Sequence, residues 1–216
     1  MKHLQERLPL ILSISFVTAI LVLTLWRLSA WADPARLLAF AFVGAYLLWL
    51  AVEARVAVGE IGKGQTGLDR GTLELYAFGR AVTVLAALAL APAQQAIGAQ
   101  AAGGFVLFVA AVLWRLNAIR ELGRFYSHRV RLRGDHQIVD TGPYRFMRHP
   151  AYTGMIFAHL GLVLFFFSWP AAALLVLLFV PAVVLRILVE EKALMSTLAG
   201  YREFSQGRPR LLPLVW

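Results

Sequence analysis

Polar residues with chemical potential gather in one short segment, residues 142–154, whose sequence is GPYRFMRHPAYTG. It holds two arginines, a histidine and two tyrosines, and a long apolar run follows it. Pro143 and Pro150 predict a shaped loop and a helix start, because proline fixes φ and lacks a backbone donor. A rigid polar loop that leads into a membrane helix is suited to hold a charged ligand against the bilayer. The alternative is an anchor whose arginines and tyrosines lie among lipid headgroups for topology alone.

A second group of ionisable residues, Arg186, Glu190 and Glu191, follows that apolar run. Arg186 and Glu190 are four residues apart, so they share one face of a helix and can pair directly. Ionisable groups at membrane depth are energetically costly, and they indicate a functional site by default. The alternative is that they extend toward the headgroups from a helix end. The sequence contains no histidine array typical of a metal site and no G-x-S-x-G or Walker motif, so no metal is predicted.

The composition indicates a protein that crosses the membrane several times. Of the 216 residues, 60% are hydrophobic, and the mean hydropathy of +0.69 lies far above that of a soluble domain. The absence of cysteine excludes disulfides, thiolate metal sites and cysteine nucleophiles. The net charge of +9 comes from residues in loops between apolar runs, so it favours orientation in the membrane over binding of nucleic acid.

The apolar runs predict an all-α, polytopic membrane helical bundle with about six spans. Residues 8–26 form the first span, which we interpret as a retained helix because it is longer than the core of a cleaved signal peptide, the alternative. Residues 37–52 form the second. Residues 81–114 and 151–185 are each too long for one span and contain a polar or proline break, which predicts two helical hairpins. Pro181 is expected to kink the last helix.

The distribution of basic residues predicts the topology. With the amino terminus in the cytoplasm, only Arg27 and Arg36 of the 21 basic residues lie outside, as the positive-inside rule requires. Both termini are therefore predicted to be cytoplasmic. The polar stretch 115–149 and the tail after Arg186 then lie on one side of the membrane, where they can form a single site.

A series of motifs follows in order along the second half of the chain. They are LGRFYS at 122–127, HQIV at 136–139, GPY at 142–144, RHPAYTG at 148–154 and, after an apolar hairpin, Arg186, EEKAL at 190–194, YREF at 201–204 and RLLP at 210–213. This series resembles the isoprenylcysteine carboxyl methyltransferase family, within the membrane methyltransferases that include phospholipid N-methyltransferases. The resemblance covers about Trp114 to Pro213. We therefore divide the chain into accessory helices with a cytoplasmic loop, residues 1–80, and a methyltransferase core with the cofactor site, residues 81–216.

The resemblance implies a helical membrane enzyme that uses S-adenosyl-L-methionine and has no Rossmann domain. The glycine-rich run GKGQTG at 62–67 is no dinucleotide site, because it follows a membrane span and no β-strand precedes it. S-adenosylmethionine has a carboxylate for an arginine, hydroxyls and an ammonium for a carboxylate, and a flat adenine for apolar and aromatic neighbours. The family motifs that enclose the cofactor correspond here to His136, Ile138, Val139, Gly142, Tyr144, Arg148, His149, Pro150, Tyr152, Gly154, Glu190 and Glu191.

The implied reaction assigns catalytic roles to Arg186 and Glu190. A sulfonium methyl is already activated, so its transfer needs alignment and exclusion of water more than acid or base chemistry. A carboxylate acceptor, which we favour, needs no base, and Arg186 would hold it. An amine acceptor would need Glu190 or Glu191 to remove a proton. The expected partners are a lipophilic small-molecule or prenylated substrate, which enters between helices, and membrane lipid.

Three alternatives remain open at this stage. The first is a phospholipid N-methyltransferase. The second is a membrane reductase of the sterol type, which shares a similar R-H-P motif but binds NADPH; Arg129, Arg131 and Arg133 suit a 2′-phosphate, although they also suit the positive-inside rule. The third is a non-enzymatic membrane scaffold, against which the combination of Arg148 with the pair Glu190 and Glu191 argues.

Overall fold

The computed structural model describes residues 2–59, 71–127, 137–212 and 216, with side chains from residue 11 onward except 56–59. These residues form an all-α bundle with no strand among them, which confirms the predicted fold class. The elements are α1 (Lys2–Leu28), α2 (Ala35–Gly59), α3 (Thr72–Leu90), α4 (Ala99–Leu122), the 3-10 helices η1 (Gly123–Phe125) and η2 (Gly142–Arg145), α5 (Pro150–Phe165), α6 (Trp169–Leu174), the π-helical turn η3 (Leu175–Phe179), α7 (Val180–Thr197) and α8 (Tyr201–Ser205).

Among the described residues, five helices are long and apolar enough to cross a membrane. They are Ile11–Leu28, Ala35–Arg55, Thr72–Leu90, Ala99–Phe125 and Trp169–Thr197. The helix α5 is apolar but has only 16 residues, about 24 Å at 1.5 Å per residue, against a hydrocarbon core of about 30 Å. The second predicted hairpin therefore has one short arm, α5, and one long arm made of α6, η3 and α7.

The helices are longer than the apolar runs that predicted them. The second predicted span ends at residue 52, whereas α2 continues to Gly59; the third begins at residue 81, whereas α3 begins at Thr72. Both extensions carry charges, Glu53 and Arg80, whose side chains pair with each other at 3.4 Å inside the bundle. Because the charges compensate each other, the helices continue where hydropathy alone would end them.

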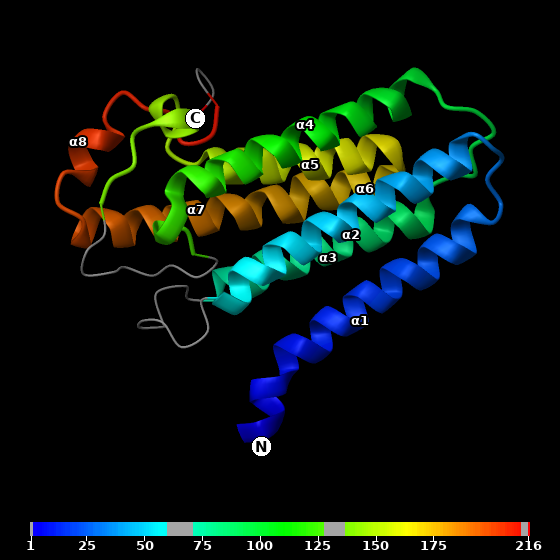
Figure 1. Cartoon of the computed structure of the whole chain (residues 1–216), viewed down its shortest axis with the longest axis horizontal. Coiled ribbons are helices and arrows are strands. Elements are labelled where there is room, and N and C mark those ends of the chain that lie inside the picture. The colour runs from blue at the N-terminus through cyan, green and yellow to red at the C-terminus, as the bar shows by residue number, and fades with distance from the viewer. Residues whose placement is uncertain (1, 60–70, 128–136, 213–215) are drawn as a thin grey trace.

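Figure 1 shows that the helices run lengthwise and that the connections α1–α2, α3–α4 and α5–α6 lie together at one end of the bundle. The opposite end carries the described parts of the connection between α4 and α5, namely η1 and η2, together with the helix α8. The polar stretch after α4 and the tail after α7 therefore meet at the same end, as the topology argument expected.

Two features fix the helices that reach this end. At the crossing of α4 and α5, a Cβ added to Gly104 would lie 2.7 Å from the carbonyl oxygen of Gly161, so only glycine permits this close approach. Along the last long helix, the π-helical turn η3 ends at Phe179, two residues before Pro181. A π-helical turn relieves the hydrogen bonding that proline interrupts, and this irregularity lies where the sequence predicted a kink.

Candidate active site

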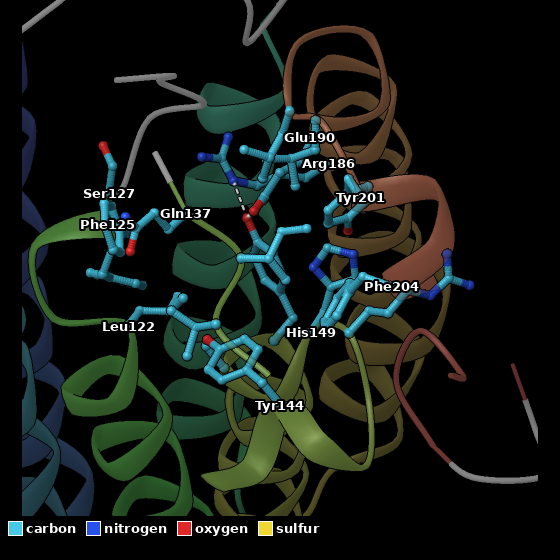
Figure 2. A pocket seen from close by; sticks show the side chains of 18 of the residues that line it. Leu122, Phe125, Ser127, Gln137, Tyr144, His149, Arg186, Glu190, Tyr201 and Phe204 are labelled. Carbon is cyan, nitrogen blue, oxygen red and sulfur yellow. Dashed lines mark hydrogen bonds between the residues drawn. The ribbon is translucent and has the colours of Figure 1, made fainter. Parts of the chain in front are cut away.

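A pocket opens at the loop-bearing end of the bundle, and Figure 2 shows side chains from several elements turned into it. Its empty space, open mouth included, is about 1040 Å³. The walls come from α3, α4, η1 with the residues after it, the segment 137–139, η2, α5, α7 and α8. The lining residues are Leu73, Tyr76, Arg115, Leu122, Phe125, Tyr126, Ser127, Gln137, Ile138, Val139, Tyr144, Arg148, His149, Ala151, Tyr152, Arg186, Glu190, Leu194, Leu198, Tyr201 and Phe204.

Most of the predicted site residues are brought together here. Eight of them line the pocket: Ile138, Val139, Tyr144, Arg148, His149, Tyr152, Arg186 and Glu190. Gly142, Pro150, Gly154 and Glu191 lie behind the lining and are described below. His136 lies outside the described residues. Residues far apart in the sequence thus share one cavity, although their binding of a cofactor stays a prediction.

A chain of hydrogen bonds joins the two predicted catalytic residues. The Nε of Arg186 donates to the hydroxyl of Tyr152 at 2.9 Å, and that hydroxyl donates to Oε2 of Glu190 at 2.7 Å. Figure 2 shows Arg186 and Glu190 side by side at one end of the pocket. The two residues share a helical face, as their spacing predicted, and the hydroxyl of Tyr152 from α5 connects them. The guanidinium of Arg186 also lies over the ring of Tyr76, 6.0 Å from its centroid.

Glu191, the neighbour of Glu190, does not line the pocket, and its carboxylate contacts three basic side chains. Its Oε1 accepts from Nη1 of Arg148 at 2.8 Å and lies 3.2 Å from Nε2 of His149. Its Oε2 accepts from Nε of Arg210 at 2.7 Å. Because Glu191 is only 3% exposed, these contacts compensate a buried carboxylate. The carboxylate thereby ties the 148–149 loop and the carboxyl-terminal tail to α7.

Backbone hydrogen bonds fasten the same tail. The amides of Arg148 and His149 donate to the carbonyls of Pro209 and Arg210, each at 2.9 Å. The hydroxyl of Thr153 donates to the carbonyl of Leu211, also at 2.9 Å. The tail thus packs behind the loop that carries the two basic pocket residues and holds that loop in place.

The remaining predicted residues shape the backbone around the pocket. Gly142 has φ 53°, and a Cβ there would lie 2.9 Å from the carboxyl carbon of Glu121. Pro150 is the first residue of α5, and its carbonyl accepts from the indole of Trp114 at 3.0 Å. A Cβ on Gly154 would lie 2.7 Å from Cβ of Arg115, so glycine there lets α5 approach α4. These contacts connect the predicted motif to α4, which precedes it in the chain.

Sequence reasoning missed several lining residues. Tyr76 lies on α3, in the part of the chain assigned to accessory helices, and Arg115 lies on α4 next to the end of a predicted span. Tyr201 and Phe204 were noted in a motif but not predicted to bind a ligand. The available signal was the charge of Arg115, since a buried arginine inside a membrane helix indicates a functional or paired position.

The electrostatics of the pocket favour neutral phenols and provide a cationic donor for a ligand. Burial, and secondarily the nearby carboxylate of Glu190, raise the pKa of Tyr144 well above its usual value. Burial likewise raises the pKa of Tyr201, with Glu191 as a further cause. Both phenols thus keep their protons at neutral pH. The Nε of Arg148 is buried and has no hydrogen-bond partner among the described residues, so it suits an anionic group.

Comparison with known proteins agrees with this geometry. No curated protein shows a significant match to the chain. Residues 104–196, however, match the model of the isoprenylcysteine carboxyl methyltransferase (ICMT) family, a range that runs from α4 through α7 and contains much of the pocket wall. The five long apolar helices found among the described residues agree with an integral membrane protein that crosses the bilayer several times. Residues 104–196 are therefore similar to the isoprenylcysteine carboxyl methyltransferase family, and this match supports a membrane methyltransferase of that type.

Proposed function

We propose that the protein is an S-adenosylmethionine-dependent methyltransferase that methylates a lipophilic acceptor, preferably a carboxylate, at the loop-bearing end of the membrane bundle. The observation that carries the proposal is the pocket itself. It combines the hydrogen-bonded chain Arg186–Tyr152–Glu190 with aromatic walls and with a donor on Arg148 that has no partner in the part of the chain that the structure describes. Few ligands present an anion, hydroxyls and a flat ring together, and S-adenosylmethionine is one of them.

The residues present fit that cofactor. The buried Nε of Arg148 offers a charge-assisted hydrogen bond to a carboxylate. Glu190 offers a carboxylate to hydroxyls or to an ammonium, and it is fixed in place by the hydroxyl of Tyr152. Tyr201 and Phe204, whose ring centroids lie 5.6 Å apart, offer an aromatic surface to an adenine. The aliphatic side chains of Ile138 and Val139 complete an apolar wall.

The bound cofactor would supply an activated methyl group on a sulfonium. The protein's own residues then have to align the acceptor and exclude water, and such positioning is worth roughly 7–11 kcal/mol of a barrier. Arg186 is 2% exposed and lines the pocket, so we assign it to hold an acceptor carboxylate. Glu190 and Tyr152 keep its guanidinium in one orientation through the shared hydroxyl.

The apolar surroundings support a lipophilic acceptor. Strongly apolar helices form much of the pocket wall. Leu73, Leu122 and Leu194 contribute to its lining. An acceptor with a lipid chain can lie between such helices while its polar end meets Arg186. The match to the family supports a methyl transfer, and the arginine favours a carboxylate over an amine.

The experiment that tests this proposal measures methyl transfer from radiolabelled S-adenosylmethionine by the detergent-purified full chain. The acceptors are a prenylated cysteine with a free carboxylate and phosphatidylethanolamine. Transfer to the first gives an ester, which alkali hydrolyses to volatile methanol, whereas an N-methyl product withstands the same treatment. We expect alkali-labile product that Glu190→Gln abolishes in a protein that still folds. An alkali-stable product would support the phospholipid N-methyltransferase instead, and absence of transfer to both acceptors would contradict the proposal.

A further inference from the structure

A buried ion pair connects the pocket to a helix outside the family match. Glu53 lies on α2, far before residues 104–196, and its Oε1 accepts from Nε of Arg115 at 2.5 Å. The side chains of Glu53 and Arg115 are 7% and 3% exposed. Two charges so deeply buried are stable only when they compensate each other and when their remaining hydrogen-bonding groups are satisfied.

Arg115 uses its other nitrogens on the pocket wall. Its Nη1 donates to the carbonyl of Ala151 at 2.8 Å, and its Nη2 donates to the hydroxyl of Tyr126 at 3.0 Å. Ala151 belongs to the first turn of α5, directly after the Arg148–His149 loop, and Tyr126 follows η1. Arg115, Ala151 and Tyr126 all line the pocket. One guanidinium thus joins two separate segments of the wall.

The second oxygen of Glu53 faces a different partner. Its Oε2 lies 3.4 Å from Nη1 of Arg80. The guanidinium of Arg80 also packs over two aromatic rings, 5.7 Å from the ring centroid of Tyr46 and 4.9 Å from that of Trp49. Arg80 does not line the pocket. The carboxylate of Glu53 therefore serves one cation that packs α3 against α2 and another that holds the pocket wall. The two contacts can be removed separately.

We propose that Glu53 is a positioning residue of the active site, which holds Arg115 against Tyr126 and the first turn of α5 and so fixes the pocket wall. The helix α2 then belongs to the working enzyme rather than to an independent anchor. This inference rests on the proposed function, because its effect is measured in binding of the cofactor product and in methyl transfer. Replacement of the carboxylate by a neutral group releases Arg115 from its fixed position, and displacement of a positioning group by an ångström lowers rates strongly.

The test compares four full-length proteins in detergent, namely the unaltered chain, Glu53→Gln, Arg80→Gln and Asp33→Asn. Asp33 is a matched control, since it forms an ion pair with Arg36 at the far end of the bundle. The side chains of Arg36 and Asp33 are 40% and 51% exposed. Affinity for S-adenosylhomocysteine, kcat/KM and the melting temperature are measured for each. We expect Glu53→Gln to lower affinity and kcat/KM about tenfold or more. Arg80→Gln should lower the melting temperature but keep the affinity, and Asp33→Asn should change neither.

Two further variants separate positioning from general packing. Glu53→Asp keeps the charge on a shorter side chain, so its affinity should lie between those of Glu53→Gln and the unaltered chain; it also serves as the test if Glu53→Gln does not fold. In an Arg115→Gln background, Glu53→Gln should add no further loss of affinity, because the residue acts through Arg115.

The outcomes that overturn the inference are distinct from those that overturn the proposed function. Unchanged affinity in Glu53→Gln, or equal losses in Glu53→Gln and Arg80→Gln, would overturn the positioning role alone. Unchanged affinity in Glu53→Asp with a lower melting temperature would do the same. Absence of S-adenosylhomocysteine binding by the unaltered chain would overturn the proposed function and this inference together.

Discussion

The buried carboxylate of Glu191 gives a quantitative prediction about how the active-site loop is held. Glu191→Gln keeps the shape of the side chain and one carbonyl oxygen as an acceptor, but it removes the negative charge that faces Arg148, His149 and Arg210. The three contacts measure 2.8, 3.2 and 2.7 Å. After the substitution, Arg148 and Arg210 remain close together without a compensating carboxylate.

The expected loss of stability follows from the burial of these groups. Removing one partner of a buried ion pair costs about 3–5 kcal/mol, because the other charge stays buried and unpaired. The side chain of Arg210 is 28% exposed, so water screens part of its share and the lower end, about 3 kcal/mol, is expected. For a chain of this size, 1 kcal/mol shifts the melting temperature by about 2–4 °C, which gives a decrease of about 6–12 °C.

The assay is thermal unfolding in detergent, followed by limited trypsin digestion at the carboxyl-terminal tail. Trypsin should also cleave the Glu191→Gln variant faster after Arg210, since the tail loses its attachment to α7. Asp33→Asn is the control: it removes a carboxylate from an exposed pair, and a change of only about 0–1 kcal/mol is expected. A melting temperature of Glu191→Gln that stays within about 2 °C of the unaltered chain would refute the role of this carboxylate as the tail's attachment.

Two other predictions concern the pocket wall. Tyr152→Phe removes the hydroxyl between the predicted catalytic residues; since a hydrogen bond to a charged group is worth about 1.5–3 kcal/mol, kcat/KM should fall about tenfold or more. The control is Tyr46→Phe, which also loses a hydrogen bond to an arginine, but Tyr46 does not line the pocket, so this variant should keep its activity. Equal losses of kcat/KM in both variants would contradict the assignment. Gly142→Ala should lower the melting temperature more than Gly207→Ala. Both glycines have positive φ, but only a Cβ at position 142 would lie against Glu121, at 2.9 Å. Equal decreases in melting temperature would show that this clash is irrelevant.

The sequence predicted the fold class, because long apolar runs indicate membrane helices. It predicted about six spans, whereas five of the described helices are long enough to cross a membrane and α5 is shorter. It failed at helix ends. Glu53, Arg80 and Arg115 looked like the limits of spans, yet all three lie inside helices, and Glu53 pairs with both arginines. A hydropathy pattern counts each charge as a cost and contains no information about a partner on another helix, so it ends the span too early.

The candidate site was predicted best where its residues are close in sequence. Tyr152 and Arg148 were named from one motif, and the structure places both in the pocket lining. The adjacent residues Glu190 and Glu191 could not be distinguished, because neighbours on a helix point about 100° apart and packing decides which of them faces the pocket. Tyr76 was missed because α3 meets the pocket only through tertiary packing, for which a single sequence offers no periodic signal.

Binding of S-adenosylmethionine in the pocket can be measured by calorimetric titration of the detergent-purified full chain with S-adenosylhomocysteine. NADPH is titrated in parallel, and Glu190→Gln is the variant control. We expect micromolar binding of S-adenosylhomocysteine that Glu190→Gln abolishes, with no heat from NADPH. Binding of NADPH instead, or no binding of S-adenosylhomocysteine by the folded protein, would contradict it.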